Sequence, residues 1–289
     1  CALGSFKNTF VSDCALKQVI RQGARCLDFE IYSVNKNPVI AVSSVKSYDI
    51  KESYNYVEFQ EAMNIINNNA FSANFCPNPD DPLILHFRIK SSHPELYEQM
   101  SNIIYSKLES RILGSNYSFE SHGHNLGNAP ISDFFTYTGT GDKKQRSGGK
   151  IIINIDKSNN MFESTGLDEY VNIASNSLFM RALTNYDVKY TPDFSELIDF
   201  NKKNMTISMP DLSVSDANVS SSLHMKYGCQ MVGMCYQNYD SNLEYYETFF
   251  AESGHAFVLK PENLRYVPVT IPAPTKQSPV KSDYYSFTI

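Results

Sequence analysis

Asp28, Glu30 and His86 could take part in acid–base chemistry, and the cation of Lys7 could attract a phosphate group. A reaction that moves protons needs one group that accepts a proton and one that donates it, and a carboxylate together with a histidine can supply both. His86 lies beside Arg88 on a predicted strand, where we expect a core or cavity residue with a hydrogen-bonded ring. These residues are the first candidates for a site.

The other histidines and the cysteines form no recognisable site by their spacing. His122-Gly123-His124 lies in a Gly- and Ser-rich stretch and is expected to be part of a loop. The sequence has no C-x-x-C pair, and the remaining histidines are isolated, so spacing assembles no metal cluster. These residues are His93, His224 and His255, and Cys1, Cys14, Cys26, Cys76, Cys229 and Cys235. A reduced, intracellular setting is favoured.

Composition indicates a globular chain and argues against two classes of protein. The 289 residues, 42% hydrophobic and 19% charged, suffice for one large domain or two small ones. A formal net charge of −6 argues against a nucleic-acid partner, because phosphate contacts need clustered Lys and Arg. The largest cluster, at 143–146, is expected to be a solvated loop. No window approaches the about 20 apolar residues of a spanning helix, so we expect no transmembrane segment.

Strand and helix patterns alternate along the chain. Short β-rich runs, apolar on successive residues, suit strands that are covered on both faces. They are Arg25 to Tyr32, Pro38 to Val42, Leu83 to Phe87, Lys150 to Ile155, Met205 to Met209, Gln230 to Tyr236 and Ala256 to Leu259. Helical spacing of apolar residues predicts amphipathic helices over 59–70 and 96–108, and 191–193 predicts the start of another over 194–200. The alternation favours a parallel βα sheet, either a barrel or a doubly wound sheet.

Two stretches interrupt this alternation. From about 114 to 149 Gly, Ser, Asn and Thr dominate, and we interpret the stretch as a surface insertion. A second break, at about 157–167, has the length of a short connector. Residues 267–289 are Pro-rich and predict a stiff linker, and their last six residues are typical of a new strand. The chain is therefore expected to be cut from a longer protein that continues into a further module.

Two segments near the end of the chain carry a family resemblance. GCQMV at 228–232 and AFVLKPENLR at 256–265 resemble the signature of eukaryotic phosphoinositide-specific phospholipase C, a GCQ-hydrophobic-V strand followed by YVLKP-x-x-LR. Further segments, in the same order as in the family, are similar to motifs of its first half. They are SFKNTF at 5–10, GARCLDFE at 23–30, PVIAVSS at 38–44, PLILHFRIK at 82–90 and GKIII at 149–153.

The resemblance implies an α/β fold, a TIM-type (β/α) barrel of the phospholipase C kind that is distorted or incompletely closed. It implies a single barrel over 1–266. The X-like half covers 1–157 with the surface insertion at about 114–149, the connector lies at about 157–167, and the Y-like half covers 168–266. Residues 267–289 follow as the linker.

Residues of other types stand at the family's catalytic positions. Members of the family cleave a phosphodiester with two histidines, assisted by a calcium ion. Those histidines align with Lys7 and Val42. A lysine ammonium holds its proton near neutral pH, and valine has no proton to exchange. The resemblance therefore implies a pseudoenzyme without catalytic residues.

The family's calcium and headgroup positions are altered as well. Asn8 is retained, Asp28 and Glu30 exchange places relative to the family, and Arg88 replaces a glutamate, so Arg88 could pair with the carboxylates in the metal's place. We expect no calcium and no other cofactor. Two lysines that bind ring phosphates in the family correspond to Asn154 and Asp156, and an Arg and a Tyr correspond to Ile207 and Met209. We expect no headgroup binding.

Two classes of function remain, and a third is permitted. The favoured one is an inactive phospholipase C-like structural, scaffold or binding module. It would have other proteins as partners in a large assembly such as a viral particle, and would be intracellular or particle-associated. The alternative is a divergent, calcium-using phosphodiesterase that acts on phosphoinositides through Lys7, Asp28, Glu30 and His86. Peripheral lipid contact at an aromatic or basic rim is the third.

Overall fold

The computed structural model of the chain describes residues 7–119, 126, 129–141, 145–212 and 216–268. His122, Gly123 and His124 lie outside the described residues, as do the first two residues of the 143–146 cluster and nearly all of the predicted linker. Within the described ranges, no helix combines the length and the apolar character needed to cross a bilayer.

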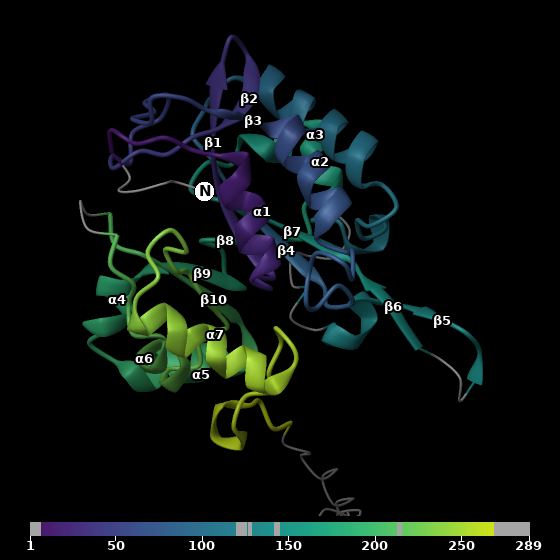
Figure 1. Ribbon diagram of the computed structural model, residues 1–289. Helices are drawn as coiled ribbons and strands as arrows, with labels where there is room; N and C mark the ends of the chain where they lie inside the picture. Colours follow the sequence, from purple (N-terminus) through teal and green to yellow (C-terminus); the bar gives the residue numbers. More distant parts are fainter. Residues whose placement is uncertain (1–6, 120–125, 127–128, 142–144, 213–215, 269–289) are drawn as a thin grey trace, which may run out of the picture.

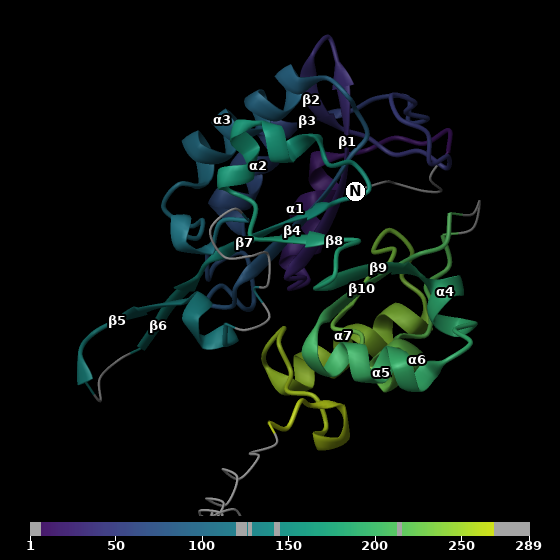
Figure 2. The same ribbon diagram turned by 180° about the vertical axis from the view of Figure 1, so that it is seen from behind.

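The parallel strands of the described chain form two neighbouring sheets (Figures 1 and 2). They are β1 (Cys26–Val34), β4 (Leu83–Ile89), β7 (Ile151–Asp156) and β8 (Ile173–Ser175) in the first sheet, and β9 (Met180–Thr184), β10 (Met205–Met209) and β11 (Met231–Val232) in the second. Two antiparallel strands, β2 (Asn37–Ile40) and β3 (Val57–Glu58), extend the first sheet beside β1.

Together the two sheets form an open barrel. β8 and β9 contact each other but share no ladder of hydrogen bonds. The edge of β1 that faces away from β4 pairs with β2 only at residues 31–34, so no described strand pairs with residues 26–30 on this edge. No described strand pairs with the second edge of β11 either. The predicted (β/α) barrel is therefore confirmed in its incompletely closed form.

Helices cover the outside of both sheets (Figure 1). α1 (Asp13–Arg21), α2 (Phe59–Asn69) and α3 (Pro94–Leu108) lie against the first sheet, and α4 (Asn185–Lys189), α5 (Phe194–Lys203), α6 (Ser221–Lys226) and α7 (Ser241–Ser253) lie against the second. The three predicted helices are confirmed to within three residues at each end. Asp193 starts α5 as predicted, because its carboxylate accepts a hydrogen bond from the Glu196 N–H and satisfies a free donor of the first turn.

Apolar side chains fill two regions, one between the helices and the first sheet and one inside the barrel. Phe87 and Tyr97 belong to the large cluster between the first sheet and α1 to α3. Ile173, Ile207 and Met231 belong to the cluster inside the barrel. Inward-facing residues of a barrel stack in layers, so the next inward layer lies toward the carboxyl ends of the strands. The polar residues of the candidate site occupy that layer.

Three predicted strands differ from the structure. Residues 256–259 form no strand, because the Ala256 N–H donates to the Asp81 carboxylate instead of a neighbouring strand. The strand expected over 230–236 is limited to Met231–Val232, since only this part pairs with β10. Residues 38–41 are buried, as their apolar run predicts, but β2 pairs antiparallel with β1 as the returning arm of a hairpin and does not join the parallel sheet as a parallel strand. Apolar content alone did not reveal which run finds a pairing partner.

The predicted surface insertion at 114–149 contains a hairpin. β5 (Phe135–Thr138) and β6 (Gln145–Gly149) pair antiparallel and project from the body of the molecule (Figures 1 and 2). Arg146, expected in a solvated loop, belongs to β6, and its guanidinium lies 3.9 Å from the centre of the Phe135 ring. The strand of Gln, Arg, Ser and Gly has no apolar pattern, which is why the sequence did not predict it.

Gly149 allows β6 to pass very close to the residues before β4. A Cβ atom at this position would overlap the backbone of Asp81, which cannot move aside as a flexible side chain would. We expect Gly149→Ala to lower the free energy of unfolding by about 1–3 kcal/mol, as overpacking does. Denaturant unfolding measures this change. Gly114→Ala is the control, because a Cβ there meets no atom within 4 Å; equal losses in the two variants would contradict the prediction.

Candidate functional site

Polar side chains from neighbouring strands meet inside the barrel, above its apolar core. The parallel register places Asp28 opposite His86 and Glu30 opposite Arg88 across β1 and β4. His86 in turn lies opposite Asn154 of β7. Residues two apart on a strand point to the same face, so these strands direct the whole set to one region of the interior.

Arg88 forms ion pairs with both carboxylates of β1. Its Nη2 lies 2.6 Å from Asp28 Oδ2, and its Nε lies 3.0 Å from Asp28 Oδ1, which makes a two-pronged contact. Its Nη1 lies 2.5 Å from Glu30 Oε1. The side chain of Glu30 is buried, and those of Arg88 and Asp28 are only 20% and 25% exposed. The pairing suggested by the sequence is thus present, with both partners.

Asp28 and Arg88 each favour the charged form of the other. Burial alone would raise the pKa of Asp28, but the charge of Arg88 and the hydrogen bonds from His86 and Arg88 outweigh it, and the pKa lies well below its usual range. Burial alone would lower the pKa of Arg88, but Asp28 and Glu30 raise it above its usual value. Asp28 and Arg88 therefore both carry their charges at neutral pH.

The side chain of His86 connects Asp28 of β1 with Ser175 of β8, the strand at the edge of the first sheet. Its Nδ1 lies 2.7 Å from Asp28 Oδ1, and its Nε2 lies 2.9 Å from Ser175 Oγ. An Asp, a His and a Ser in this order form the catalytic relay of serine hydrolases. Here both His86 and Ser175 are fully buried. The three residues therefore form a hydrogen-bonded chain that connects the strands, and a substrate cannot reach the Ser175 hydroxyl.

The two predicted headgroup positions on β7, Asn154 and Asp156, are engaged in hydrogen bonds within the chain. Asn154 is fully buried, and its Oδ1 accepts a hydrogen bond from the Ser175 N–H at 3.1 Å. Asp156 Oδ1 accepts from the Ser158 N–H at 2.9 Å and from Asn176 Nδ2 at 2.7 Å. Burial would raise the pKa of Asp156, but these hydrogen bonds prevail and lower it. Asp156 therefore carries a negative charge at neutral pH.

The loop positions Lys7, Asn8 and Val42 gather around one acidic residue, Glu52. Lys7 is exposed, and its Nζ lies 4.0 Å from Glu52 Oε1. The Asn8 N–H donates to the Glu52 carbonyl oxygen, and the Glu52 N–H donates to the Val42 carbonyl oxygen. The structure therefore brings these three positions together around Glu52.

Sequence reasoning missed Glu52 and three residues that complete the polar network: Tyr32, Ser43 and Ser175. The Tyr32 hydroxyl and the Ser43 N–H both donate to Glu30 Oε2 at 3.1 Å. Tyr32 follows Glu30 by two residues on β1, and this spacing was a usable signal. Ser175 ends a strand of three residues, which is too short to give a recognisable apolar run.

The donor set does not fit a calcium ion. Calcium takes 6–8 oxygen ligands, and it competes poorly for oxygens that already neutralise a cation. Both oxygens of Asp28 and Oε1 of Glu30 contact Arg88, and Oε2 of Glu30 accepts the hydrogen bonds from Tyr32 and Ser43. In the part of the chain that the structure describes, no group of three or more His, Cys, Asp and Glu side chains is arranged to hold a metal.

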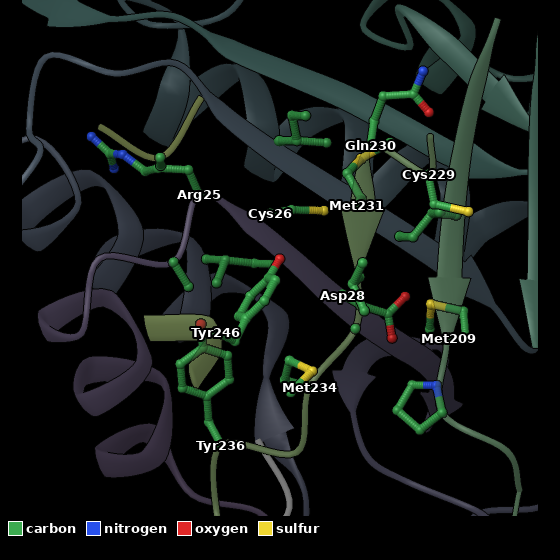
Figure 3. A pocket seen from close by; sticks show the side chains of 18 of the residues that line it. Arg25, Cys26, Asp28, Met209, Cys229, Gln230, Met231, Met234, Tyr236 and Tyr246 are labelled. Atoms are coloured by element: carbon green, nitrogen blue, oxygen red, sulfur yellow. The ribbon is translucent and has the colours of Figure 1, made fainter. Parts of the chain in front are cut away.

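A cavity of about 1480 Å³ adjoins this polar layer along the open side of the barrel. Asp28, Arg88 and the two predicted headgroup positions of β10, Ile207 and Met209, all contribute to its wall. Figure 3 shows residues of β1 and β11 on its two sides, with Tyr246 between them. The barrel mouth is therefore continuous with a large space that the missing strand leaves open.

Comparisons with known proteins bear on the fold and on part of the chain. Residues 159–263 match the family described as phosphatidylinositol-specific phospholipase C, Y domain. The structure is similar to crystal structures of PLC21 from L. pealei (TM-score 0.66, 17% identity) and PLC21 from S. officinalis (TM-score 0.65, 18% identity). Each match covers 92% of this chain and 36% of the other, so the chain spans about a third of their length. No curated protein sequence matches the chain.

Removing the guanidinium tests the ion pairs. We expect Arg88→Met to lower the free energy of unfolding at pH 7 by roughly 3 kcal/mol, because two neighbouring carboxylates would lose their counter-charge. The pKa of Asp28 is lowered in the folded state, so this stabilisation is complete above the unfolded pKa of about 4 and is lost as the pH falls below it. The difference between the variant and the parent should therefore narrow in acid.

Denaturant unfolding between pH 7 and pH 3 measures this difference. Arg181→Met is the matched control, because Arg181 pairs with Glu196 in a largely exposed position, where a lost ion pair costs less than about 1 kcal/mol. Equal losses in the two variants, or a loss at Arg88 that does not depend on pH, would contradict the prediction.

Proposed function

We propose that this chain, which is similar in fold to phospholipase C structures and matches the family's Y domain over residues 159–263, is a catalytically inactive barrel that acts as a binding or scaffold module. The observation that carries the proposal is the contact of Arg88 with both Asp28 and Glu30. A metal-assisted hydrolase keeps carboxylate oxygens free for its metal ion, whereas this chain neutralises them with its own cation. A fold has an activity only through such a site.

The other altered positions support the same conclusion. Lys7 and Val42 supply no group that exchanges a proton near neutral pH. Asp156 would repel a ring phosphate, and Asn154 is fully buried under its own hydrogen bonds. Loss of acid–base, metal and phosphate groups together indicates a barrel that is retained for something other than hydrolysis.

A module of this kind would act through its surface. Large exposed side chains on loops and helix starts at the carboxyl ends of the strands, among them Tyr54, Leu178 and Tyr186, offer contact area for other proteins. We place the module in a large assembly such as a viral particle, and light scattering of the purified chain alone and with candidate partners tests this. Binding to lipid vesicles instead of proteins would favour peripheral membrane contact.

The second candidate is a divergent phosphodiesterase that acts on phosphoinositides. The observation in its favour is the 2.7 Å contact between His86 and Asp28, which would hold the ring in one orientation toward a substrate if the barrel opened. Such an enzyme would still have to release Asp28 from Arg88. We therefore rank it below the inactive module.

Hydrolysis assays separate the two candidates. We expect the purified chain not to cleave phosphatidylinositol 4,5-bisphosphate, with or without calcium, because the acid–base positions are Lys7 and Val42. Release of inositol phosphate is the measurement. Turnover that disappears in His86→Gln but persists in His93→Gln would overturn the inactive module and establish the divergent enzyme.

Calcium titration tests the role of Arg88 directly. We expect calorimetry to detect no calcium binding by the parent chain, and binding to appear in Arg88→Glu, because that change frees Asp28 and Glu30 and adds a third carboxylate. Arg181→Glu adds the same charge at an exposed site and should bind none. Calcium binding by the parent chain would sink the assignment of Arg88 as the occupant of the metal position.

A further inference from the structure

The open side of the barrel creates a space with a definite chemical character. β1 and β11 bound the cavity of about 1480 Å³ on this side, and α1 and α7 contribute to its outer wall. Ligand pockets for small molecules measure roughly 300–1,000 Å³, so this cavity has room for a long flexible molecule. The cavity separates two strands that a closed barrel would join through one more strand.

Apolar and adaptable side chains dominate this wall. Cys26 of β1, Met231 of β11 and Met234 of the following loop approach one another around the space, and Tyr246 projects between the two strands from α7 (Figure 3). Burial raises the pKa of the Cys26 thiol to about 12, so it behaves as a small apolar group. Methionine side chains adjust to the shape of a flexible guest. A wall of this kind suits an alkyl chain.

One cation on the same wall has no anionic partner. Lys260 is half-buried, its Nζ donates to the Asn201 carbonyl oxygen at 2.7 Å, and it forms no ion pair with another described residue. Burial lowers the pKa of Lys260 to about 8, which reflects an ammonium that has lost part of its water without gaining an anion. An anionic group beside Nζ would offset the cost of burying this charge.

Each of the other Lys and Arg side chains of the wall either contacts a partner group or is exposed to solvent. Arg88 is paired with Asp28 and Glu30. Arg25 donates to two backbone carbonyl groups, those of Ala70 and Asn78, and Lys46 and Lys226 are exposed to water. Lys90 lies over the ring of Tyr48. Lys260 is therefore the cation of this wall that would stabilise a bound anion most.

We propose that this cavity binds a single-chain anionic amphiphile, a fatty-acid carboxylate, with its alkyl chain between β1 and β11 and its carboxylate at Lys260. The apolar wall supplies affinity in proportion to the length of chain that it removes from water. The ammonium of Lys260 supplies selectivity for a carboxylate over an alcohol of the same length. The site is separate from the Arg88 network, so the proposal holds whether the barrel mouth is active or inactive.

Calorimetry of the whole chain with dodecanoate, decanoate and dodecanol, each below its micelle concentration, tests the proposal. Dodecanoate should bind with 1:1 stoichiometry and about fifteenfold more tightly than decanoate, because burying two more methylene groups adds about fourfold each. Dodecanol should bind about tenfold more weakly than dodecanoate. Equal affinities for dodecanoate and dodecanol, or no dependence on chain length, would overturn the proposal.

Variants locate the two ends of the ligand. Lys260→Gln should weaken dodecanoate about tenfold and leave dodecanol unchanged, whereas Lys260→Arg should keep most of the affinity. Lys226→Gln, a change at an exposed lysine of the same wall, is the control. Met234→Trp, in a loop, should fill the cavity and weaken both ligands while the unfolding temperature without ligand stays near that of the parent. Unchanged binding in Lys260→Gln or in Met234→Trp contradicts the proposal.

Discussion

The ion pairs of Arg88 with Asp28 and Glu30 are the constraint on which the polar interior of this barrel depends. Three charged groups in a largely enclosed layer are tolerable only when their geometry is good and their remaining hydrogen-bonding positions are filled. His86, Tyr32 and Ser43 fill those positions. The network therefore fixes the register of β1 against β4 and the position of the loop after β2, and it decides what the mouth of the barrel can bind.

The same network separates two parts of the molecule with different character. Below it the barrel is filled with Ile, Met and Phe side chains, which give the chain its packed core. Beside it the wall is interrupted between β11 and the first half of β1, and the space there is large and mostly apolar. Among the described cations that line this space, Lys260 is partly buried and has no charged or aromatic partner, and it is the only one with both properties.

Likeness of fold and retention of activity are thus distinct questions for this chain. The fold resembles phospholipase C structures at 17–18% identity, over about a third of their length. Positions that set the barrel, such as the buried Ile207 and Met231, need only a suitable size and apolarity. Positions that set chemistry need a particular functional group, because a carboxylate and a guanidinium offer opposite charges to a ligand. A shared fold therefore does not by itself carry a shared reaction.

The sequence by itself determined the class of fold, most parallel strands and the main amphipathic helices, because periodic burial of apolar residues is written into local spacing. It also determined that Arg88 stands among carboxylates. Only the tertiary structure decided that Arg88 engages both Asp28 and Glu30, that His86 reaches Ser175 on β8, and that the run 256–259 finds no strand to pair with. These features depend on which strands become neighbours and on where the barrel fails to close, and contacts between distant segments leave no periodic signal in the chain.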